Sequence, residues 1–501
     1  MITISVEQLC KATNGQLKKG YACLAQCASV SINNVSTDTR TIQKNDLFIA
    51  LKGPSFDAHQ LLAMAIDKGA AVLLVEANRE VSIATDVIVI EVTDTRIALG
   101  LLGSYVKQQI NGLKTAAITG SNGKTTCKEL LNAILTVHSG SADKVLATAG
   151  NFNNDIGLPL TLLRLEAQHQ FAVLELGANH IGEIAYTSAL TKPDVALVNN
   201  VMPAHLEGFG SLQGIATAKA EIWSSLDSTG IAVVNLDANF AQDFIKQLQN
   251  KQQNFVGFSI APENLSSVNA DVFATAICSN NLGQASFILN VKQSNLTSKS
   301  LLTNQEPNSL QNIQVQLNLP GKHNVSNALA ASTMALALGC SLKEIKQGLE
   351  TLQQVAGRVN CTVISEQLTV IDDTYNANSA SVKAAIDLLA LYQGQHLLIC
   401  GDMGELGEYA EQEHQEIGVY AQKNDIEQLF TVGNLSKLTT NGYNALSINS
   451  EAKHFTDKQQ LKSAIEAYFL TQKSNVVVLV KGSRSAKMEE IVAFIKQNFA
   501  A

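Results

Sequence analysis

The chain has 501 residues, too many for one hydrophobic core, and its 46% hydrophobic and 16% charged residues are typical of a folded soluble protein of about three domains. Its net charge of −8 excludes the basic surface of a nucleic-acid-binding protein. No apolar run reaches the ~18 residues of a membrane span, which excludes membrane insertion.

The cysteines and the first residues indicate a reducing compartment. Met1–Gln8 lacks the basic and apolar regions of a signal peptide. The eight cysteines form no CxxC pair. Cys23 and Cys27 have no second pair or histidine cluster nearby that would complete a zinc site. We therefore expect free thiols in a reducing cytoplasm.

Residues 1–92 predict a small mixed α/β region. Its expected elements are strands at Val30–Val35, Asp46–Leu51 and Ala71–Val75 and a helix at Gln60–Lys68. Two polar clusters stand out, Ser36-Thr37-Asp38-Thr39-Arg40 and Phe56-Asp57-Ala58-His59. Turns and helix caps explain both on composition alone, because Ser, Thr and Asp bond to nearby backbone groups.

A glycine loop joins a predicted strand to a predicted helix near position 120. Lys114–Thr119 is a short apolar run that favours a buried strand, and Gly120-Ser121-Asn122-Gly123 favours a turn. The apolar residues that follow recur at the spacing of one helix face: Cys127, Leu130, Leu131, Ile134 and Leu135.

Such a loop presents backbone N–H groups and the positive end of a helix to an anion. Lys124 adds a cation, and Thr125 adds a hydroxyl group suited to Mg²⁺, so the loop predicts a nucleotide-triphosphate site. The usual phosphate-loop spacing needs a glycine where Ile118 stands, so the match is to a shorter form. An ordinary strand-to-helix turn is the alternative interpretation.

The rest of residues 93–356 alternates strands with helices, which favours a parallel sheet covered by helices. We expect helices at Thr93–Gln109, Ile215–Leu226 and Asn324–Leu338, and strands at Phe171–Leu176, Val195–Asn199 and Ile231–Asn235. Residues 255–319 change to short alternating strands without helices between them. Ser294–Asn312, rich in Ser, Asn, Gln and Leu, has the composition of an exposed insertion.

Residues 357–501 predict a second α/β unit. Its expected strands are Leu368–Ile371, His396–Cys400, Gln428–Val432 and Val476–Val480, and its last helix is Ala486–Gln497. Glycine-containing turns at 401–404 and 482–484 follow two of these strands. Ligands of open α/β sheets collect at such carboxyl ends.

Three ionisable residues of the central region could serve the phosphate site. Glu175 ends a buried-looking strand, where a carboxylate can hold Mg²⁺ beside the loop. His205 follows the next strand, and its position favours a site over the structural role that a lone histidine usually has. Lys219 lies on a helix after a glycine turn, and a solvated surface lysine is the alternative there.

Two clusters of amides and acids complete the set. Asn324 and Asn327 share a helix face and could read an adenine edge, although helix capping alone would explain Asn324. Asp372-Asp373-Thr374-Tyr375-Asn376-Ala377-Asn378 ends a strand with two acids and two amides. So dense a polar cluster after an apolar strand favours a binding site over a plain loop.

Taken together, these motifs resemble the Mur ligase family over nearly the whole chain. The sequences TGSNGKTT, LELGANH, NNVMPAHLEGFGS, AKAEIW, GKHNVSNALAA and AGR at 356–358 fit the wider superfamily, which includes folylpolyglutamate synthase. STDTR with FDAH, DDTYNANSASVKAA, GDMGELG and VKGSR resemble most closely the branch that adds D-alanyl-D-alanine to UDP-N-acetylmuramoyl-tripeptide. The segment near 294–312 departs from the family.

The resemblance implies a three-domain α/β fold. Residues 1–92 would form a small α/β domain that binds the UDP substrate. Residues 93–356 would form a P-loop, parallel-sheet ATP-binding domain with a β-rich extension. Residues 357–501 would form a Rossmann-like domain that binds the incoming dipeptide.

The resemblance also implies a role for each candidate residue. ATP would contact Gly120, Ser121, Asn122, Gly123, Lys124, Thr125, Thr126, Asn324, Asn327 and Arg358. Two Mg²⁺ ions would be held by Thr125, Glu175, His205 and Lys219, the last as a carbamate formed with CO₂; Lys124, His205 and Lys219 would be the catalytic residues. The substrates would contact Ser36, Thr37, Asp38, Thr39 and Arg40 (UDP), Asn151 and Asn154 (muramoyl peptide), and Asp373, Tyr375, Asn376 and Asn378 (dipeptide).

The implied activity is ATP-dependent amide ligation through an acyl phosphate, in a monomer of the bacterial cytoplasm. Lysine and diaminopimelate both remain open as the third residue of the tripeptide. The alternatives are a sister ligase, either the tripeptide-forming Mur ligase or folylpolyglutamate synthase, and a P-loop protein that hydrolyses ATP as a switch. Residues 1–92 disfavour the folate enzyme, and DDTYNAN disfavours the other two.

Overall fold

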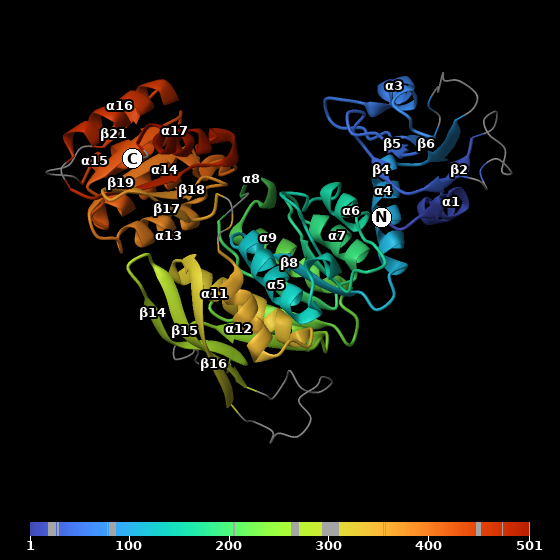
Figure 1. Cartoon of the computed structure of the whole chain (residues 1–501), viewed down its shortest axis with the longest axis horizontal. Helices are drawn as coiled ribbons and strands as arrows, with labels where there is room; N and C mark the ends of the chain where they lie inside the picture. Colours follow the sequence, from blue (N-terminus) through green and yellow to red (C-terminus); the bar gives the residue numbers. More distant parts are fainter. Residues whose placement is uncertain are drawn as a thin grey trace.

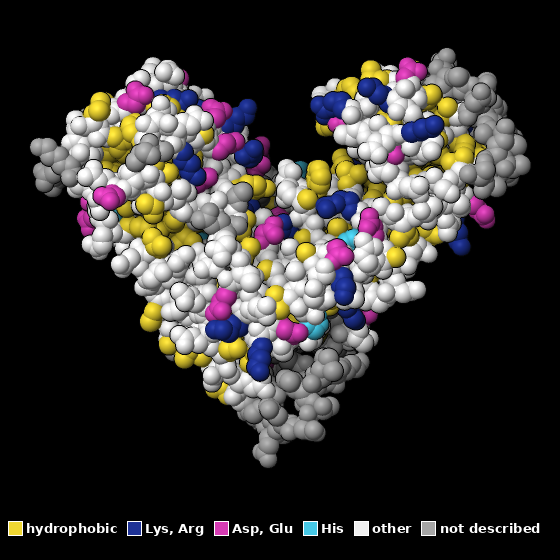
Figure 2. Space-filling view, in the orientation of Figure 1, with side chains coloured by type: hydrophobic (Ala, Val, Ile, Leu, Met, Phe, Trp, Pro, Cys, Tyr) yellow, Lys and Arg dark blue, Asp and Glu magenta, His cyan; other side chains and the backbone are white. Residues whose placement is uncertain are grey.

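The computed structural model describes residues 1–18, 27, 30–77, 79, 87–203, 206–261, 270–292, 310–353, 355, 357–446, 452–472 and 474–499. They form an N-terminal lobe (blue), a central lobe (cyan to yellow) and a C-terminal lobe (orange to red), as Figure 1 shows. The surface is deeply notched between the two outer lobes (Figure 2). Among the described helices, none is both long and apolar enough to cross a membrane.

The N-terminal lobe is built on a five-stranded sheet of order β2-β7-β6-β5-β4, parallel except for β2. Its strands are β2 (Gln16–Leu17), β4 (Val35–Ser36), β5 (Leu47–Ile49), β6 (Val72–Glu76) and β7 (Ile88–Val92). Its helices are α1 (Val6–Thr13), η1 (Ala58–Leu61) and α3 (Leu62–Asp67). A separate antiparallel pair joins β1 (Ile4–Ser5) to β3 (Ser31–Ile32).

The strand expected at Val30–Val35 is wrong as one element, because β3 and β4 belong to different sheets. Asn33 and Asn34 separate them. Thr3 donates to the Asn33 side chain at 2.7 Å, and the Asn34 amide donates to Asp46 at 2.9 Å. These two polar side chains bond in different directions, which explains why the chain changes sheets here.

The central lobe contains a nine-stranded sheet of order β16-β15-β14-β13-β12-β11-β8-β10-β9. Its strands are β8 (Lys114–Thr119), β9 (Val145–Ala147), β10 (Phe171–Glu175), β11 (Val195–Val198), β12 (Ile231–Asn235), β13 (Phe255–Ser259), β14 (Val272–Ser279), β15 (Gln284–Lys292) and β16 (Leu310–Pro320). Neighbours from β9 to β14 are parallel, whereas β15 and β16 are antiparallel. The strands that begin at 272 and 284 have no helix between them, as predicted.

Helices cover both faces of this sheet. They are α4 (Thr95–Gln108), α5 (Lys124–Ser139), η2 (Ala142–Lys144), α6 (Gly157–Leu162), α7 (Glu183–Thr191), α8 (Leu206–Phe209), α9 (Leu212–Ala220), η3 (Glu221–Ser225), α10 (Ala241–Asn250), α11 (Lys322–Ala337) and α12 (Leu342–Thr351). Alternation along β8 sends Ala117 into the core shared with α4 and α6, and Ile118 into the core shared with α5 and α11. Helix α4 also packs against α1, so it joins the N-terminal and central lobes.

The C-terminal lobe is a six-stranded sheet of order β17-β18-β22-β19-β20-β21, parallel except for β17. The strands are β17 (Asn360–Ser365), β18 (Leu368–Asp373), β19 (Gln395–Gly401), β20 (Gln428–Val432), β21 (Lys453–Phe455) and β22 (Val476–Lys481). The helices are α13 (Ser379–Leu389), η5 (Gly407–Tyr409), α14 (Ala410–Lys423), α15 (Ser436–Asn444), α16 (Lys458–Thr471), η6 (Arg484–Ala486) and α17 (Glu489–Phe499). The predicted three-part α/β architecture is confirmed.

Two expected boundaries need correction. Residues 484–486 form a 3₁₀ turn, and the last helix begins at Glu489 instead of Ala486. Leu310–Asn312, expected in the insertion, belongs to β16 and pairs with β15. Residues 294–309 of the expected insertion lie outside the described residues.

Candidate functional site

The predicted glycine loop lies between β8 and α5 at the carboxyl edge of the central sheet. Gly123 has φ +79°, and a Cβ there would lie 2.4 Å from Asn327 Oδ1 and 2.6 Å from Asn199 Nδ2. Only glycine fits this left-handed and crowded position. Helix α5 begins at the next residue, so the positive helix end faces the loop.

Side chains that follow β11 hold the loop in place. The Asn122 N–H donates to Asn200 Oδ1 at 2.9 Å, and the amides of Asn199 and Asn200 both donate to the Asn122 carbonyl at 3.0 Å. Ser121 Oγ donates to the Met202 carbonyl at 2.9 Å. Asn199 and Asn200 are absent from the predicted site residues; their signal was two asparagines directly after the neighbouring buried strand.

Lys124 lies across the loop. Its Nζ donates to the carbonyl oxygen of Gly120 at 2.7 Å and approaches that of Ser121 at 3.3 Å. Burial lowers the pKa of this amine; Arg358 acts in the same direction, and Glu175 opposes it. An arriving anion would favour the protonated amine.

Thr125 and Glu175 meet below the loop. Thr125 Oγ1 donates to Glu175 Oε2 at 2.9 Å, and Asn153 Nδ2 donates to Glu175 Oε1 at 2.8 Å. Glu175 is only 3% exposed and forms no ion pair with a described cation. From the C-terminal lobe, Arg358 Nη2 donates to Thr125 Oγ1 at 2.9 Å. Asn153 was not predicted, although it stands between the predicted Asn151 and Asn154.

Lys219 is a buried lysine rather than a solvated one. It is 3% exposed on α9, its Nζ lies 5.8 Å from the ring centroid of Phe209, and it forms no hydrogen bond with another described residue. Burial, and then repulsion from Lys124, lowers its pKa well below the ordinary value of a lysine. A neutral amine is therefore favoured at this position. His205 lies outside the described residues.

The predicted asparagine pair on α11 faces the loop. Asn327 Nδ2 donates to Asn324 Oδ1 at 3.0 Å, and Asn324 Nδ2 donates to the Pro320 carbonyl at 2.7 Å. Asn199 Nδ2 donates to Asn327 Oδ1 at 3.1 Å. Helix capping does not explain Asn324, because the N-cap of α11 is Gly321. These amides tie α11 to the loop, and their contact with adenine stays a prediction.

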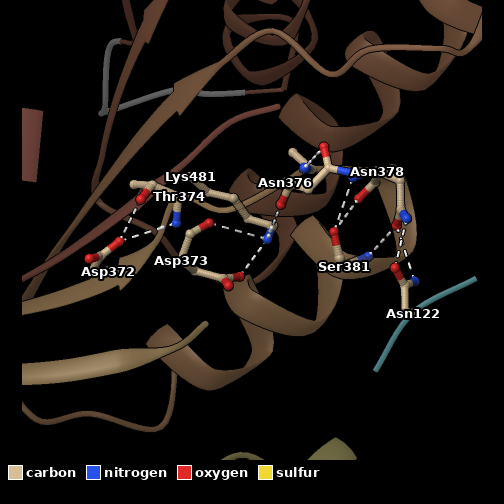
Figure 3. A network of polar contacts seen from close by, with 9 residues as sticks. Asn122, Asp372, Asp373, Thr374, Asn376, Asn378, Ser381 and Lys481 are labelled. Atoms are coloured by element: carbon tan, nitrogen blue, oxygen red, sulfur yellow. Dashed lines mark hydrogen bonds and ion pairs between the residues drawn. The ribbon is translucent and has the colours of Figure 1, made fainter. Parts of the chain in front are cut away.

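The acid and amide cluster Asp372–Asn378, called here the cluster after β18, begins with the last two residues of that strand. Its Asn378 end meets Asn122 of the glycine loop (Figure 3). Lys481 forms an ion pair with Asp373 and donates to the Asn376 carbonyl at 3.0 Å. Asn378 and Asn122 exchange side-chain hydrogen bonds of 2.7 and 3.2 Å across the two lobes. Tyr375 stacks on Arg358, 4.2 Å from ring centroid to guanidinium carbon. Lys481 was named only within a motif and not as a site residue.

The N-terminal cluster forms a turn on its own lobe. Arg40 pairs with Asp38 at 2.6 Å, and this hydrogen-bonded guanidinium lowers the pKa of Asp38 to about 2. Asp57 caps η1 through the His59 N–H and contacts the His59 ring at 2.6 Å. Turn and cap chemistry therefore accounts for this geometry, and the UDP role stays a prediction.

Asn151 and Asn154 lie in the loop that precedes α6, and both are exposed. Asn154 Oδ1 accepts a hydrogen bond from the Gly157 N–H at 2.8 Å. The structure thus brings together the residues of the glycine loop, Glu175, Lys219, the α11 asparagines, Arg358 and the cluster after β18. It does not bring Ser36–Arg40 to them.

In a comparison with known protein families, three family models match successive parts of the chain. They are "Mur ligase family, catalytic domain" at residues 31–106, "Mur ligase middle domain" at 118–335 and "Mur ligase, glutamate ligase domain" at 357–484. A Haemophilus influenzae protein named UDP-N-acetylmuramoyl-tripeptide–D-alanyl-D-alanine ligase is 40% identical over 93% of this chain and 94% of its own length.

Two solved structures from Acinetobacter baumannii share the whole fold. Crystal structure I of MurF has a TM-score of 0.87 at 35% identity, covering 99% of this chain and 100% of that one. The UDP-N-acetylmuramoylalanyl-D-glutamyl-2,6-diaminopimelate–D-alanyl-D-alanyl ligase has a TM-score of 0.83 at 34% identity, covering 99% of each chain.

The burial of Lys219 predicts a pH-dependent effect of Lys219→Met in CO₂-free buffer without Mg²⁺. The pKa of a lysine in an unfolded chain is near 10.4, and the pKa of Lys219 in the folded protein is lower. Between these two pKa values the unfolded chain binds one proton more than the folded protein, so the free energy of unfolding of the wild type rises with pH. The variant should be more stable than the wild type at pH 7, and its advantage should shrink toward pH 10. Denaturant unfolding at both pH values measures this.

Lys128→Met is the matched control for this prediction. Lys128 is also 3% exposed, but its Nζ donates to the Thr148 carbonyl at 2.7 Å and pairs with Glu129 at 2.6 Å. This variant should lose stability, because it leaves the carbonyl of the buried Thr148 without its donor. A Lys219→Met advantage that is the same at pH 7 and pH 10 contradicts the proposed neutral amine.

Proposed function

The chain belongs to the Mur ligase family, and on that premise we propose that it joins D-alanyl-D-alanine to UDP-N-acetylmuramoyl-tripeptide in an ATP-dependent reaction of peptidoglycan synthesis. The observation that carries this function is the cluster after β18, whose Asn378 bonds to Asn122 of the glycine loop. Residues suited to an amino-acid substrate therefore lie against residues suited to phosphate. A P-loop switch protein would not need that cluster.

The glycine loop would bind the ATP phosphates. Residues 120–126 supply backbone N–H groups at the start of α5, and Lys124 supplies a cation for the β- and γ-phosphate oxygens. Arg358, which contacts Thr125, would reach the phosphates from the C-terminal lobe. The side chains of Asn324 and Asn327 would change partners to contact adenine.

The donor set under the loop fits Mg²⁺. Glu175 is a buried carboxylate whose oxygens accept hydrogen bonds only from neutral donors among the described residues, and Thr125 brings its hydroxyl oxygen to 2.9 Å from it. A hydroxyl group and a carboxylate are hard oxygen ligands of the kind Mg²⁺ prefers. Bound there, the ion would offset the electrostatic repulsion between the phosphates of ATP and the carboxylate of the tripeptide.

A second Mg²⁺ would be held by His205 and a carbamylated Lys219. Carbamate formation from CO₂ requires the neutral amine that burial of Lys219 favours. The reaction joins the lysine nitrogen to the CO₂ carbon and releases one proton. It replaces a neutral amine with an anionic oxygen ligand.

The three lobes would divide the substrates between them. We assign UDP to residues 1–92 with the turn Ser36–Arg40, ATP and the muramoyl peptide to residues 93–356 with Asn151 and Asn154, and the dipeptide to residues 357–501. Within the last range, Asp373, Tyr375 and the exposed Asn376 would contact the dipeptide. The notch between the outer lobes leaves room for the long UDP substrate (Figure 2).

The chemistry follows in two steps. A carboxylate oxygen of the tripeptide bonds to the γ-phosphorus of ATP as the bond to the β-phosphate oxygen breaks, which gives an acyl phosphate and ADP. The amine nitrogen of the dipeptide then bonds to the acyl carbon and loses its proton, and inorganic phosphate leaves. Lys124 would stabilise the charge of the transferring group, and closure of the C-terminal lobe would exclude water.

Mass spectrometry of the product tests the proposed function. The reaction contains UDP-N-acetylmuramoyl-tripeptide, D-alanyl-D-alanine, ATP and Mg²⁺. The diaminopimelate form of the tripeptide comes first, because the Acinetobacter relative is named for it. The expected product is UDP-N-acetylmuramoyl-pentapeptide with one ADP and one phosphate. Phosphate release that needs neither peptide substrate would indicate an ATP switch instead.

Removing the Lys124 amine should lower turnover by about 10²- to 10³-fold, because the lost charge faces the transferring phosphoryl group. Lys124→Ala should leave the fold intact, since the Lys124 side chain at the start of α5 lies across the loop and not in a core. The steady-state ligation rate and the unfolding midpoint measure the two effects. Lys251→Ala, at an exposed lysine after α10, is the control, and near-normal ligation by Lys124→Ala would remove the loop from the mechanism.

The carbamate predicts a distinctive pattern at position 219. Lys219→Ala should be nearly inactive, and added acetate or formate should partly restore turnover by supplying the missing oxygens. Lys219→Arg keeps a positive charge but forms no carbamate, so it should be as poor as the alanine variant. Ligation rates with and without these acids are the measurement, and an active arginine variant would end the carbamate proposal.

A further inference from the structure

Two asparagines 256 residues apart form a reciprocal amide pair between the lobes. Asn378 Nδ2 donates to Asn122 Oδ1 at 2.7 Å, and Asn122 Nδ2 donates to Asn378 Oδ1 at 3.2 Å (Figure 3). Asn378 is only 9% exposed. Its amide group is thus engaged with the glycine loop rather than directed toward an open pocket.

The pair connects two segments that are each held firmly. On the central side, the backbone N–H and carbonyl of Asn122 are both bonded to Asn200. On the C-terminal side, Asn378 is the N-cap of α13: its Oδ1 accepts from the Ser381 N–H at 2.9 Å, and its own N–H donates to Ser381 Oγ at 3.0 Å. A shift of one segment would therefore be transmitted to the other.

Two further hydrogen bonds join the same lobes. Arg358 donates to Thr125 while it stacks on Tyr375, next to the phosphate loop. The Tyr392 hydroxyl donates to the Leu282 carbonyl at 2.9 Å, in the turn between β14 and β15. Of these contacts, only the asparagine pair joins the phosphate loop directly to the cluster after β18.

We propose that Asn122 and Asn378 form a latch that fixes the position of the dipeptide cluster over the phosphate loop, and that Asn378 is a positioning residue and not a dipeptide ligand. The inference rests on the proposed function, in which an acyl phosphate on one lobe must meet an amine held by the other. The rate of such a step depends steeply on the distance and angle between the reacting atoms.

The neutral hydrogen bonds of the latch suit a contact that must break when the two lobes separate. Both partners are uncharged, and neutral hydrogen bonds contribute modestly because water replaces them on separation. The lobes can therefore part for substrate exchange and close in the same register. When the two lobes are misaligned, the amine reacts more slowly and the acyl phosphate has a longer lifetime. Water can then hydrolyse it to carboxylate and phosphate.

Three variants separate the latch from the cap. Asn378→Ser keeps an oxygen that can cap the Ser381 N–H but is too short to reach Asn122. Asn122→Ala removes the partner and leaves the backbone bonds to Asn200 in place. Ser381→Ala is the matched control, since it removes the hydroxyl that bonds the Asn378 backbone and leaves the amide pair intact.

The first measurement is the ratio of phosphate released to pentapeptide formed, with kcat and the KM of each substrate. The ratio should be one for the wild type and for Ser381→Ala. It should exceed one for Asn378→Ser and Asn122→Ala, with kcat about tenfold or more below wild type. The double variant should be no worse than either single variant, because both remove one interaction.

The second measurement does not depend on activity. Small-angle X-ray scattering without substrates should give a larger radius of gyration for both latch variants and their double variant than for the wild type and Ser381→Ala. This result would support the latch even if the wild type made no pentapeptide, which would refute only the proposed function. Wild-type compactness in the latch variants overturns the proposal. So does a selective rise in dipeptide KM for Asn378→Ser with the phosphate ratio still at one, which would make Asn378 a ligand.

Discussion

The hydrogen bonds between the Asn122 backbone and the side chains of Asn199 and Asn200 are the constraint on which the site depends. A glycine loop is intrinsically mobile, and buried backbone groups need partners. Asparagines at the end of the adjacent parallel strand supply them because β8 and β11 are neighbours. The register of the central sheet therefore determines the position of the loop. The loop in turn determines the positions of the side chains that bond to it.

Two lysine amines of the site, those of Lys124 and Lys219, have lowered pKa values because of burial. Lys124 is partly buried and Lys219 is buried. Repulsion from Lys124 lowers the pKa of Lys219 further. Glu175 is buried nearby with neutral partners. The two amines disfavour each other's charge, and Glu175 forms no ion pair with a cation among the described residues. Phosphates that bind together with cations would supply the missing opposite charges. The site is thus organised for the charges of the proposed substrates.

Local pattern predicted the elements that carry the loop. β8 has the expected bounds, and all five predicted apolar positions of α5 are buried. The expectation of one strand at Val30–Val35 was wrong, because these six residues do not reveal that Asn33 and Asn34 bond to different neighbours. Asn199 and Asn200 lie at the end of a predicted strand, but one sequence does not reveal that this strand lies next to β8, so their bonds to the loop were not predicted. The contact of Asn153 with Glu175 likewise joins segments whose proximity the sequence does not reveal. The Asn122–Asn378 contact joins distant segments and needs three-dimensional information.

In the proposed reaction, the carboxylate of the tripeptide is activated as an acyl phosphate at the glycine loop. The most direct measurement uses UDP-N-acetylmuramoyl-tripeptide with ¹⁸O in its terminal carboxylate, followed by mass spectrometry of the phosphate released during ligation. An oxygen of the carboxylate bonds to phosphorus and leaves with it, so each phosphate should carry one carboxylate-derived ¹⁸O. Unlabelled phosphate formed together with pentapeptide would contradict it.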